Sequence, residues 1–261
     1  MPTVEENYAF WNDRFDWSNH RGDVWSREWG GPTNQWYWCV YPRIRRQLPT
    51  GTILEIGPGQ GRWTHFLLPY CERLVLVDIS HRCIEVCRDR FGKAAVECHV
   101  GDGRTLSFQE DESVDFVFSF ESLVHTEILD LTSYLKEVAR VLKPKGRAFL
   151  HHSNLGHYPR YYGLVNGIPG SLRTTLQGRG VLDFDGWRAL SVSAEKVRRS
   201  AEQEQLTVHS QELVPWGGKR LIDCFTSLGK GTAAETKVYE NHEFAERARE
   251  VKTISYAYEI R

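Results

Sequence analysis

The sequence predicts an α/β fold in which a mostly parallel sheet carries helices on both faces. Between residues 53 and 152, short apolar runs rich in β-branched residues alternate with stretches of helical pattern. Such alternation is typical of strand–helix–strand units, whose right-handed crossovers make neighbouring strands parallel. The first run, Ile53–Ile56, leads directly into a glycine-rich loop. Ligands of open sheets bind beyond the carboxyl ends of the strands, so this loop is a candidate binding site.

The later elements follow in a regular order. Further strands are predicted at Arg73–Asp78, Ala94–Val100, Val114–Phe120 and Arg147–His152. Leucine and valine recur at three- and four-residue steps from Leu131 to Leu142, which predicts a helix ended by Lys-Pro-Lys-Gly. Beyond it we expect a helix at Ser193–Gln205 with Ser193 as its N-cap, two strands at 206–214 and 221–228, and a terminal helix at 241–252.

The spacing of the glycines in this loop indicates which class of ligand it can bind. Glycine lacks a Cβ and tolerates positive φ, so backbone at Gly57, Gly59 and Gly61 can come close to a bound molecule. A dinucleotide-binding loop has the spacing G-x-G-x-x-G. Here the third glycine comes one position early, and Arg62 occupies the dinucleotide position. This spacing disfavours a nicotinamide oxidoreductase.

Acidic residues stand at the ends of the next two strands. Asp78 ends the second strand, where a carboxylate can accept hydrogen bonds from both ribose hydroxyls of an adenosine. Asp102 follows the third strand, and its carboxylate can accept from an adenine amino group. The two acids and the glycine loop together predict a nucleoside site.

The pattern Glu55-x-Gly57-x-Gly59-x-Gly61, with Asp78 and Asp102 in register behind it, resembles the class I S-adenosylmethionine-dependent methyltransferases. The resemblance covers roughly Thr52–Ser153. It implies a Rossmann-like, mostly parallel seven-stranded sheet with a closing antiparallel strand, and S-adenosylmethionine as the cofactor. It also implies that Glu55 binds the methionine amino group. The implied cofactor contacts are Glu55, Gly57, Gly59, Gly61, Asp78, Ile79, Asp102, Gly103, Ser119 and Phe120.

Composition limits the other classes of protein. The 261 residues suit one α/β domain with extensions, and the net charge of −1 argues against nucleic acid held on a basic face. No apolar run is long enough to span a membrane, and the polar N-terminus is not a secretion signal. Six cysteines without a C-x-x-C pair suggest buried, reduced thiols in a cytoplasmic protein.

Two aromatic segments flank or interrupt this domain. We expect residues 1–49 to form an aromatic N-terminal lid, because six of the nine tryptophans precede residue 39. Residues 50–261 are then the methyltransferase domain, with 154–190 as a candidate substrate cap. Aromatic faces stack on sugars, rings and cations, and the predicted substrate contacts are Trp25, Trp29, Trp36, Tyr158, Tyr161 and Tyr162.

Methyl transfer to a hydroxyl also requires a general base, and histidine is the natural base near neutral pH. His125 follows the fourth strand, and His151 and His152 end the fifth, where alternation makes them face opposite ways. We expect His152 to face the methyl group, because it lies nearer the strand end. Glu121 is a fourth candidate that can orient a histidine or bind substrate. No spacing of carboxylates calls for a metal.

Within the methyltransferases, two short segments resemble a narrower group, the bacterial methyltransferases found with surface-polysaccharide assembly. These segments are Trp25-Ser26-x-x-Trp29-Gly30 and His151–Leu155. This implies a hydroxyl on a sugar or glycan as acceptor. Three alternatives remain open from the sequence: an N-methyltransferase of a small molecule, for which Glu121 would matter more; a non-catalytic protein that binds S-adenosylmethionine; and the disfavoured oxidoreductase.

Overall fold

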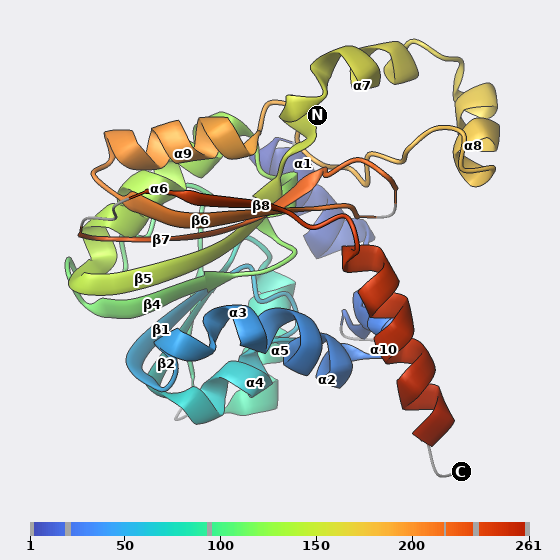
Figure 1. Cartoon of the computed structure of the whole chain (residues 1–261). Coiled ribbons are helices and arrows are strands. Elements are labelled where there is room, and N and C mark those ends of the chain that lie inside the picture. The colour runs from blue at the N-terminus through green and yellow to red at the C-terminus, as the bar shows by residue number, and fades with distance from the viewer. Residues whose placement is uncertain (1–2, 19–21, 93–95, 217, 232–234, 259–261) are drawn as a thin grey trace.

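A single sheet of eight strands runs through the part of the chain that the structure describes (Figure 1). This computed structural model describes residues 3–18, 22–92, 96–216, 218–231 and 235–258. The strand order is β3-β2-β1-β4-β5-β7-β6-β8. The strands are β1 (Thr50–Ile56), β2 (Cys71–Asp78), β3 (Val96–Val100), β4 (Val114–Ser119), β5 (Leu142–Ser153), β6 (Thr207–Val214), β7 (Asp223–Gly229) and β8 (Lys237–Glu240).

The strand directions agree with the predicted mixed sheet, but the predicted count of seven strands is wrong. Strand β7 is antiparallel to both of its neighbours, β5 and β6, and the other pairs are parallel. The eighth strand, β8, adds four exposed residues beside β6 at the sheet edge. It was not predicted, because a short exposed strand carries no apolar alternation. The predicted start of the third strand, at Ala94 and Ala95, lies outside the described residues.

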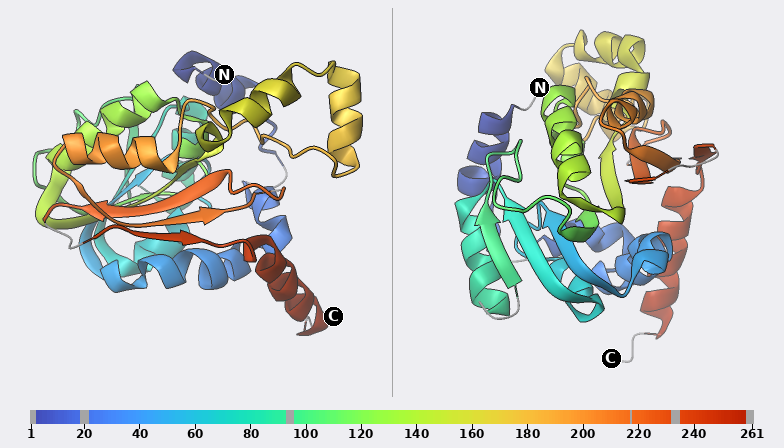
Figure 2. Two further views of the ribbon diagram at one scale, coloured as in Figure 1. Left: turned by 45° about the horizontal axis from the view of Figure 1, so that its top comes forward. Right: turned by 90° about the vertical axis from the view of Figure 1, so that its left-hand side faces the viewer.

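Side-chain alternation along the strands builds two cores, one on each face of the sheet. Leu54 and Ile56 pack on one face against the helices α6 (Ile128–Val141) and α9 (Ala194–Gln203). Ile53 packs on the other face, where tryptophans from the N-terminal segment join the core. That face is covered by α4 (Thr64–Leu67), α5 (His81–Phe91) and the N-terminal helices (Figure 2).

The N-terminal segment folds as a chain of short helices, as its glycine and proline content predicts. They are α1 (Val4–Tyr8), η1 (Ala9–Arg14), η2 (Asp23–Trp29), α2 (Pro32–Gln35), η3 (Trp36–Val40), α3 (Tyr41–Ile44) and η4 (Arg45–Gln47). The C-terminal helix α10 (Phe244–Tyr258) packs against η2 and α2. The first and last parts of the chain therefore lie side by side (Figure 1).

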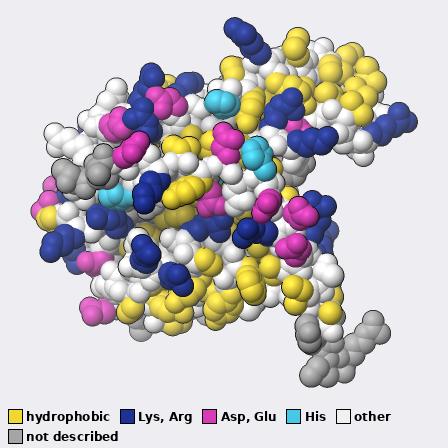
Figure 3. Space-filling model, viewed as in Figure 1, with side chains coloured by type: hydrophobic (Ala, Val, Ile, Leu, Met, Phe, Trp, Pro, Cys, Tyr) yellow, Lys and Arg dark blue, Asp and Glu magenta, His cyan; other side chains and the backbone are white. Residues whose placement is uncertain are grey.

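The predicted cap segment stands away from the body (Figure 1). After η7 (Leu155–His157) it forms α7 (Pro159–Asn166) and α8 (Gly170–Gly178), and the chain then returns to α9. Hydrophobic side chains gather on this excursion in Figure 3. Its helices α7 and α8 carry the exposed Leu164 and Leu172. Its base is a small core around Tyr162 and Ile222. None of the helices in the described residues is long and apolar enough to cross a membrane.

The helix ends follow their capping residues. Ser193 caps α9 by accepting a hydrogen bond from the backbone N–H of Lys196, which confirms the predicted N-cap. Ser80 caps α5 in the same way through the N–H of Cys83. The remaining short helices are η5 (Leu68–Tyr70), after α4, and η6 (Leu123–His125), which leads from β4 to α6.

Candidate functional site

A pocket lies at the carboxyl ends of β1, β2 and β4, which is where ligands of open α/β sheets bind. It encloses about 930 Å³, counting the space that is open to solvent. Its wall combines the glycine loop, the residues after β2 and β4, and the N-terminal helices. The predicted site residues that line it are Gly57, Gly59, Asp78, Ile79, Gly103, Phe120, Glu121, His125 and Trp25.

The glycine loop has the backbone conformation that its sequence predicts. Gly57, Gly59 and Gly61 have φ of 70°, 56° and 81°, a region that side chains with a Cβ rarely adopt. Gly57 and Gly59 line the pocket, whereas Gly61 does not. A Cβ on Gly61 would lie 2.5 Å from the ring of Phe91. Gly61 therefore serves the packing of the loop on α5, and its predicted contact with the cofactor is not supported by this geometry.

Asp78 closes the loop from the end of β2. One carboxylate oxygen accepts a hydrogen bond from the N–H of Gly59 at 3.0 Å, and the other accepts from the N–H of Ser80 at 2.8 Å. Burial raises the pKa of Asp78 to about 6, while the backbone donors oppose that rise. The side chain thus stays beside the glycine loop, in the wall of the pocket, where a ribose diol would meet it.

Three predicted cofactor residues besides Gly61 lie outside the pocket wall. Glu55 is buried and accepts a hydrogen bond from the hydroxyl of Thr64 at 2.7 Å; burial raises its pKa to about 8. Asp102 is exposed and turns into its own loop. Ser119 is buried and donates to the carbonyl of Ile56. Direct contacts to the methionine amino group by Glu55 and to adenine by Asp102 are not supported by these positions.

Glu121 forms an ion pair inside the pocket wall rather than a free acid. Its carboxylate bonds to Arg62, and both side chains are more than nine-tenths buried. The guanidinium of Arg62 also lies over the rings of Trp25 and Trp63, at 5.3 and 4.5 Å from their centroids. Glu121 has a φ of 59°, unusual for a residue other than glycine. A strained residue at the end of β4 is typical of functional sites.

The three predicted histidines differ in their hydrogen bonds. His125 lines the pocket, and its Nδ1 lies 2.9 Å from the carbonyl oxygen of Trp187. A carbonyl can only accept, so Nδ1 carries the proton and Nε2 keeps its lone pair. Among the described residues Nε2 has no hydrogen-bond partner. Burial, followed by the charge of Arg188, lowers the pKa of His125 to about 4.

His152, the favoured base, lies outside the pocket wall, and so does His151. They point to opposite faces of the sheet, as expected. The Nδ1 of His152 faces the Ser153 carbonyl, so its Nε2 accepts from the hydroxyl of Thr226 at 2.7 Å. His151 accepts from the backbone N–H of Glu121 through Nδ1 and donates to Asp223 through Nε2. Neither ring retains a free lone pair, so the choice of His152 as the base is not supported by the structure.

The aromatic wall of the pocket comes largely from residues that were not predicted. Trp11 and Trp17 line the pocket together with Trp25. Trp29 and Trp36 lie instead in the core under the sheet, where Trp36 stacks on Phe66 at 5.0 Å. The sequence indicated the segment but not which tryptophans turn inward. Further pocket residues that were missed are Val4, Asn7, Arg62, Trp63, Asp130 and Tyr134.

The cap tyrosines do not line the pocket. The hydroxyl of Tyr161 accepts a hydrogen bond from the N–H of Asp183, and that of Tyr158 accepts from the N–H of Leu221. Tyr162 is buried in the base of the cap. Their predicted substrate contact is therefore not supported by these positions. Within the described residues, no group of three or more His, Cys, Asp or Glu side chains is placed to hold a metal ion.

The fold and this site define a class: a Rossmann-like methyltransferase fold. Residues 54–150 match the family model described as "Methyltransferase domain". The bifunctional biotin-biosynthesis protein BioHC of Cellvibrio japonicus is 36% identical over 110 residues, which span 42% of this chain and 21% of that protein. This stretch of the chain is therefore an S-adenosylmethionine-dependent methyltransferase domain, and S-adenosylmethionine is its cofactor.

Solved structures extend the likeness of fold to most of the chain. The PH0226 protein of Pyrococcus horikoshii superposes with a TM-score of 0.56 at 24% identity, covering 86% of this chain and 96% of that one. An S-adenosylmethionine-dependent methyltransferase from Clostridium acetobutylicum superposes at 0.53 with 15% identity, covering 88% and 100%. At this level of identity the likeness shows the fold.

One relative concerns the expectation that the protein has no nucleic-acid partner. An rRNA adenine N-6-methyltransferase of Streptomyces fradiae is 48% identical over 50 residues, 19% of this chain and 16% of that protein. That relative is named for a nucleic-acid substrate, so the expectation that nucleic acid is excluded gains no support from the comparisons. The chain spans well under half of each of these two curated relatives.

Proposed function

We propose that the protein transfers the methyl group of S-adenosylmethionine to a hydroxyl of a small-molecule or glycan acceptor, with His125 as the general base. The observation that carries the proposal is the free Nε2 of His125 in the pocket wall, fixed by the bond from Nδ1 to Trp187. An alcohol must lose its proton as the new carbon–oxygen bond forms, and a positioned base accelerates that step about 10²–10⁴-fold.

His125 is neutral at neutral pH, because burial lowers the pKa of its ring to about 4. Nε2 can therefore accept a proton, with the low basicity that this pKa gives it. The ring of Trp11 lies 5.5 Å from that of His125, and Trp17 lies 6.2 Å from Trp11. A sugar ring held on such aromatic faces would present a hydroxyl to Nε2. The short helices of residues 1–49 would then act as the lid over the acceptor.

The carboxylates of the pocket favour a neutral acceptor over an amine. Asp78 accepts from backbone N–H groups, Glu121 is paired with Arg62, and Asp130 is paired with Arg104. Apart from Asp78, which the ribose would occupy, an ammonium ion would find no carboxylate without a cationic partner among the described pocket residues. The tryptophan faces nevertheless attract cations, so N-methylation of a small molecule is the second candidate, and cofactor binding without catalysis is the third.

A transfer assay separates these functions. Labelled S-adenosylmethionine is incubated with sugars, phenols and amines, in the wild type and in His125→Asn. We expect turnover with a hydroxyl class of acceptor, and a loss of about 10²–10³-fold in kcat for His125→Asn with little change in cofactor affinity. The exposed His157→Asn is the matched control and should keep wild-type turnover.

Turnover with amines alone would overturn the choice of a hydroxyl acceptor, and full activity of His125→Asn would overturn the assignment of the base. Binding of the cofactor product without turnover of any acceptor would favour the third candidate. The cytoplasm, where S-adenosylmethionine is made, is the compartment in which we propose that the protein works.

A further inference from the structure

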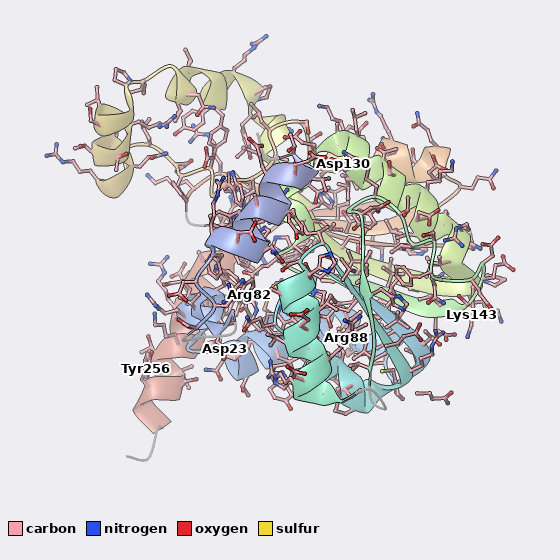
Figure 4. The ribbon with its side chains drawn as sticks, turned by 180° about the vertical axis from the view of Figure 1, so that it is seen from behind. Asp23, Arg82, Arg88, Asp130, Lys143 and Tyr256 are labelled. Carbon is pink, nitrogen blue, oxygen red and sulfur yellow. The ribbon has the colours of Figure 1, made fainter. Side chains whose placement is uncertain are left out.

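Asn7 places an amide in the pocket that the proposed reaction does not use. It lies in α1 and lines the pocket together with Asp130, which is labelled in Figure 4 at the start of α6. Helix α1 begins with a capping box in which Thr3 and Glu6 exchange hydrogen bonds. Val4 and Asn7, three residues apart and so on one face of the helix, both line the pocket.

The orientation of the amide follows from its one hydrogen bond. The Nδ2 of Asn7 donates to the backbone carbonyl of His125 at 3.0 Å. A carbonyl cannot donate, so the nitrogen must be on this side and Oδ1 on the other. Asn7 is only 7% exposed, and its Oδ1 is buried with no partner. Buried acceptors are rarely left unpaired in folded proteins, so this oxygen is available to a donor on a molecule bound in the pocket that Asn7 lines.

The neighbours of Asn7 indicate which part of the cofactor that donor belongs to. A Cβ on Gly103 would lie 2.8 Å from a methyl of Val4 and 3.3 Å from a methyl of Ile79. Val4, Ile79 and Gly103 therefore form one apolar patch beyond the ends of β2 and β3. Ile79 of this patch directly follows Asp78, the candidate partner of the ribose. The adenine attached to that ribose would therefore lie on the patch. Asn7 stands at the edge of this patch.

Asp102, the acid expected to bind the adenine amino group, uses its carboxylate for hydrogen bonds within its own loop. Asp102 accepts hydrogen bonds from the N–H groups of Arg104 and Thr105 and from the Thr105 hydroxyl, at 2.7–2.8 Å. Its side chain does not line the pocket. Asn7 on α1 therefore offers a buried, unpaired acceptor in this wall, whereas Asp102 on the loop after β3 does not.

We propose that Oδ1 of Asn7 accepts a hydrogen bond from the exocyclic amino group of the cofactor's adenine. The inference rests on the cofactor of the proposed function and not on its acceptor. An amino group donates, whereas the carbonyl that replaces it in hypoxanthine only accepts. Asn7 therefore selects adenosine over inosine, and the N-terminal segment completes the cofactor site.

The test compares the binding of two ligands to the wild type and to two variants. Calorimetry gives the affinities of S-adenosylhomocysteine and S-inosylhomocysteine, without acceptor, for wild type, Asn7→Leu and Thr3→Ala. We expect the wild type to prefer the adenosyl ligand at least tenfold, and Asn7→Leu to reduce this preference below threefold. Thr3→Ala loosens α1 through its capping box alone, so both affinities should fall together and the preference should stay.

Asn7→Ala removes the amide without adding bulk and serves as the second variant if Asn7→Leu fails to fold. It should likewise reduce the preference for adenosine below threefold. A wild-type preference that survives in Asn7→Leu overturns the proposal. So does unchanged binding of S-adenosylhomocysteine with a raised KM for the acceptor, because Oδ1 would then serve the acceptor. A wild type that binds the adenosyl ligand but turns over no hydroxyl would contradict the proposed function and leave this test intact.

Discussion

At the scale of single residues, hydrogen bonds rather than residue types decide which predicted groups face the ligand. The three histidines are equivalent candidates in the sequence. In the fold, carbonyl and hydroxyl partners occupy both nitrogens of His152, while one carbonyl at Trp187 leaves Nε2 of His125 free. The Thr226 hydroxyl comes from β7 and the Trp187 carbonyl from the cap segment, each more than 60 residues away from its histidine in the chain. No local pattern around a histidine contains that information.

Glu55 gives a prediction at this scale. Its pKa in the folded state is about 8 against an ordinary 4.5, because burial disfavours the charged form. The folded state therefore keeps a proton that the unfolded state loses, and this group's contribution to stability falls as pH rises from about 4.5 to 8. One proton corresponds to about 1.4 kcal/mol per pH unit.

Glu55→Gln removes this dependence, so the stability of the variant relative to wild type should rise between pH 5 and pH 8. Its affinity for S-adenosylhomocysteine should stay within about threefold of wild type, because Glu55 does not line the pocket. Urea unfolding across pH and calorimetry measure both, with the exposed Glu85→Gln as control. A large loss of affinity would instead place Glu55 on the methionine amino group.

At the scale of elements, the strands and the glycine loop could be predicted because their signals are local. Apolar runs, the helix pattern at Leu131–Leu142 and the N-cap Ser193 each act within a few residues. The inward tryptophans could not be chosen this way. The ring of Trp17 lies 5.5 Å from that of Trp25 in the pocket wall, whereas Trp29 packs 5.4 Å from Phe244 of α10. Contacts between the two ends of the chain make that difference.

Two glycines, one in the glycine loop and one in α7, offer contrasting substitutions to alanine. In Gly61→Ala the new Cβ meets the Phe91 ring at 2.5 Å, at a φ of 81°. The strain and the overlap should lower the free energy of unfolding by about 2–4 kcal/mol. In Gly163→Ala, in α7, the Cβ meets nothing within 4 Å, and the helix should gain up to about 1 kcal/mol. Equal effects of the two substitutions in denaturant unfolding would contradict this account of Gly61.

At the scale of the whole molecule, the site is assembled from distant parts of the chain. The domain at residues 54–150 supplies the loop and Asp78. The N-terminal helices add Asn7 and the tryptophans, and the cap segment holds His125 through Trp187. The sequence resemblance covers the first of these parts, which is why six of the ten implied cofactor residues line the pocket but only one of the six predicted substrate residues does.

The central claim is that adenosine binds between the glycine loop and Asp78. The direct measurement is a calorimetric titration of wild type and Asp78→Ala with S-adenosylhomocysteine and with a nicotinamide dinucleotide. We predict one site for S-adenosylhomocysteine, a loss of at least tenfold in affinity in Asp78→Ala, and no binding of the dinucleotide. Equal affinity of the two proteins for S-adenosylhomocysteine, or tight binding of the dinucleotide, would contradict the claim.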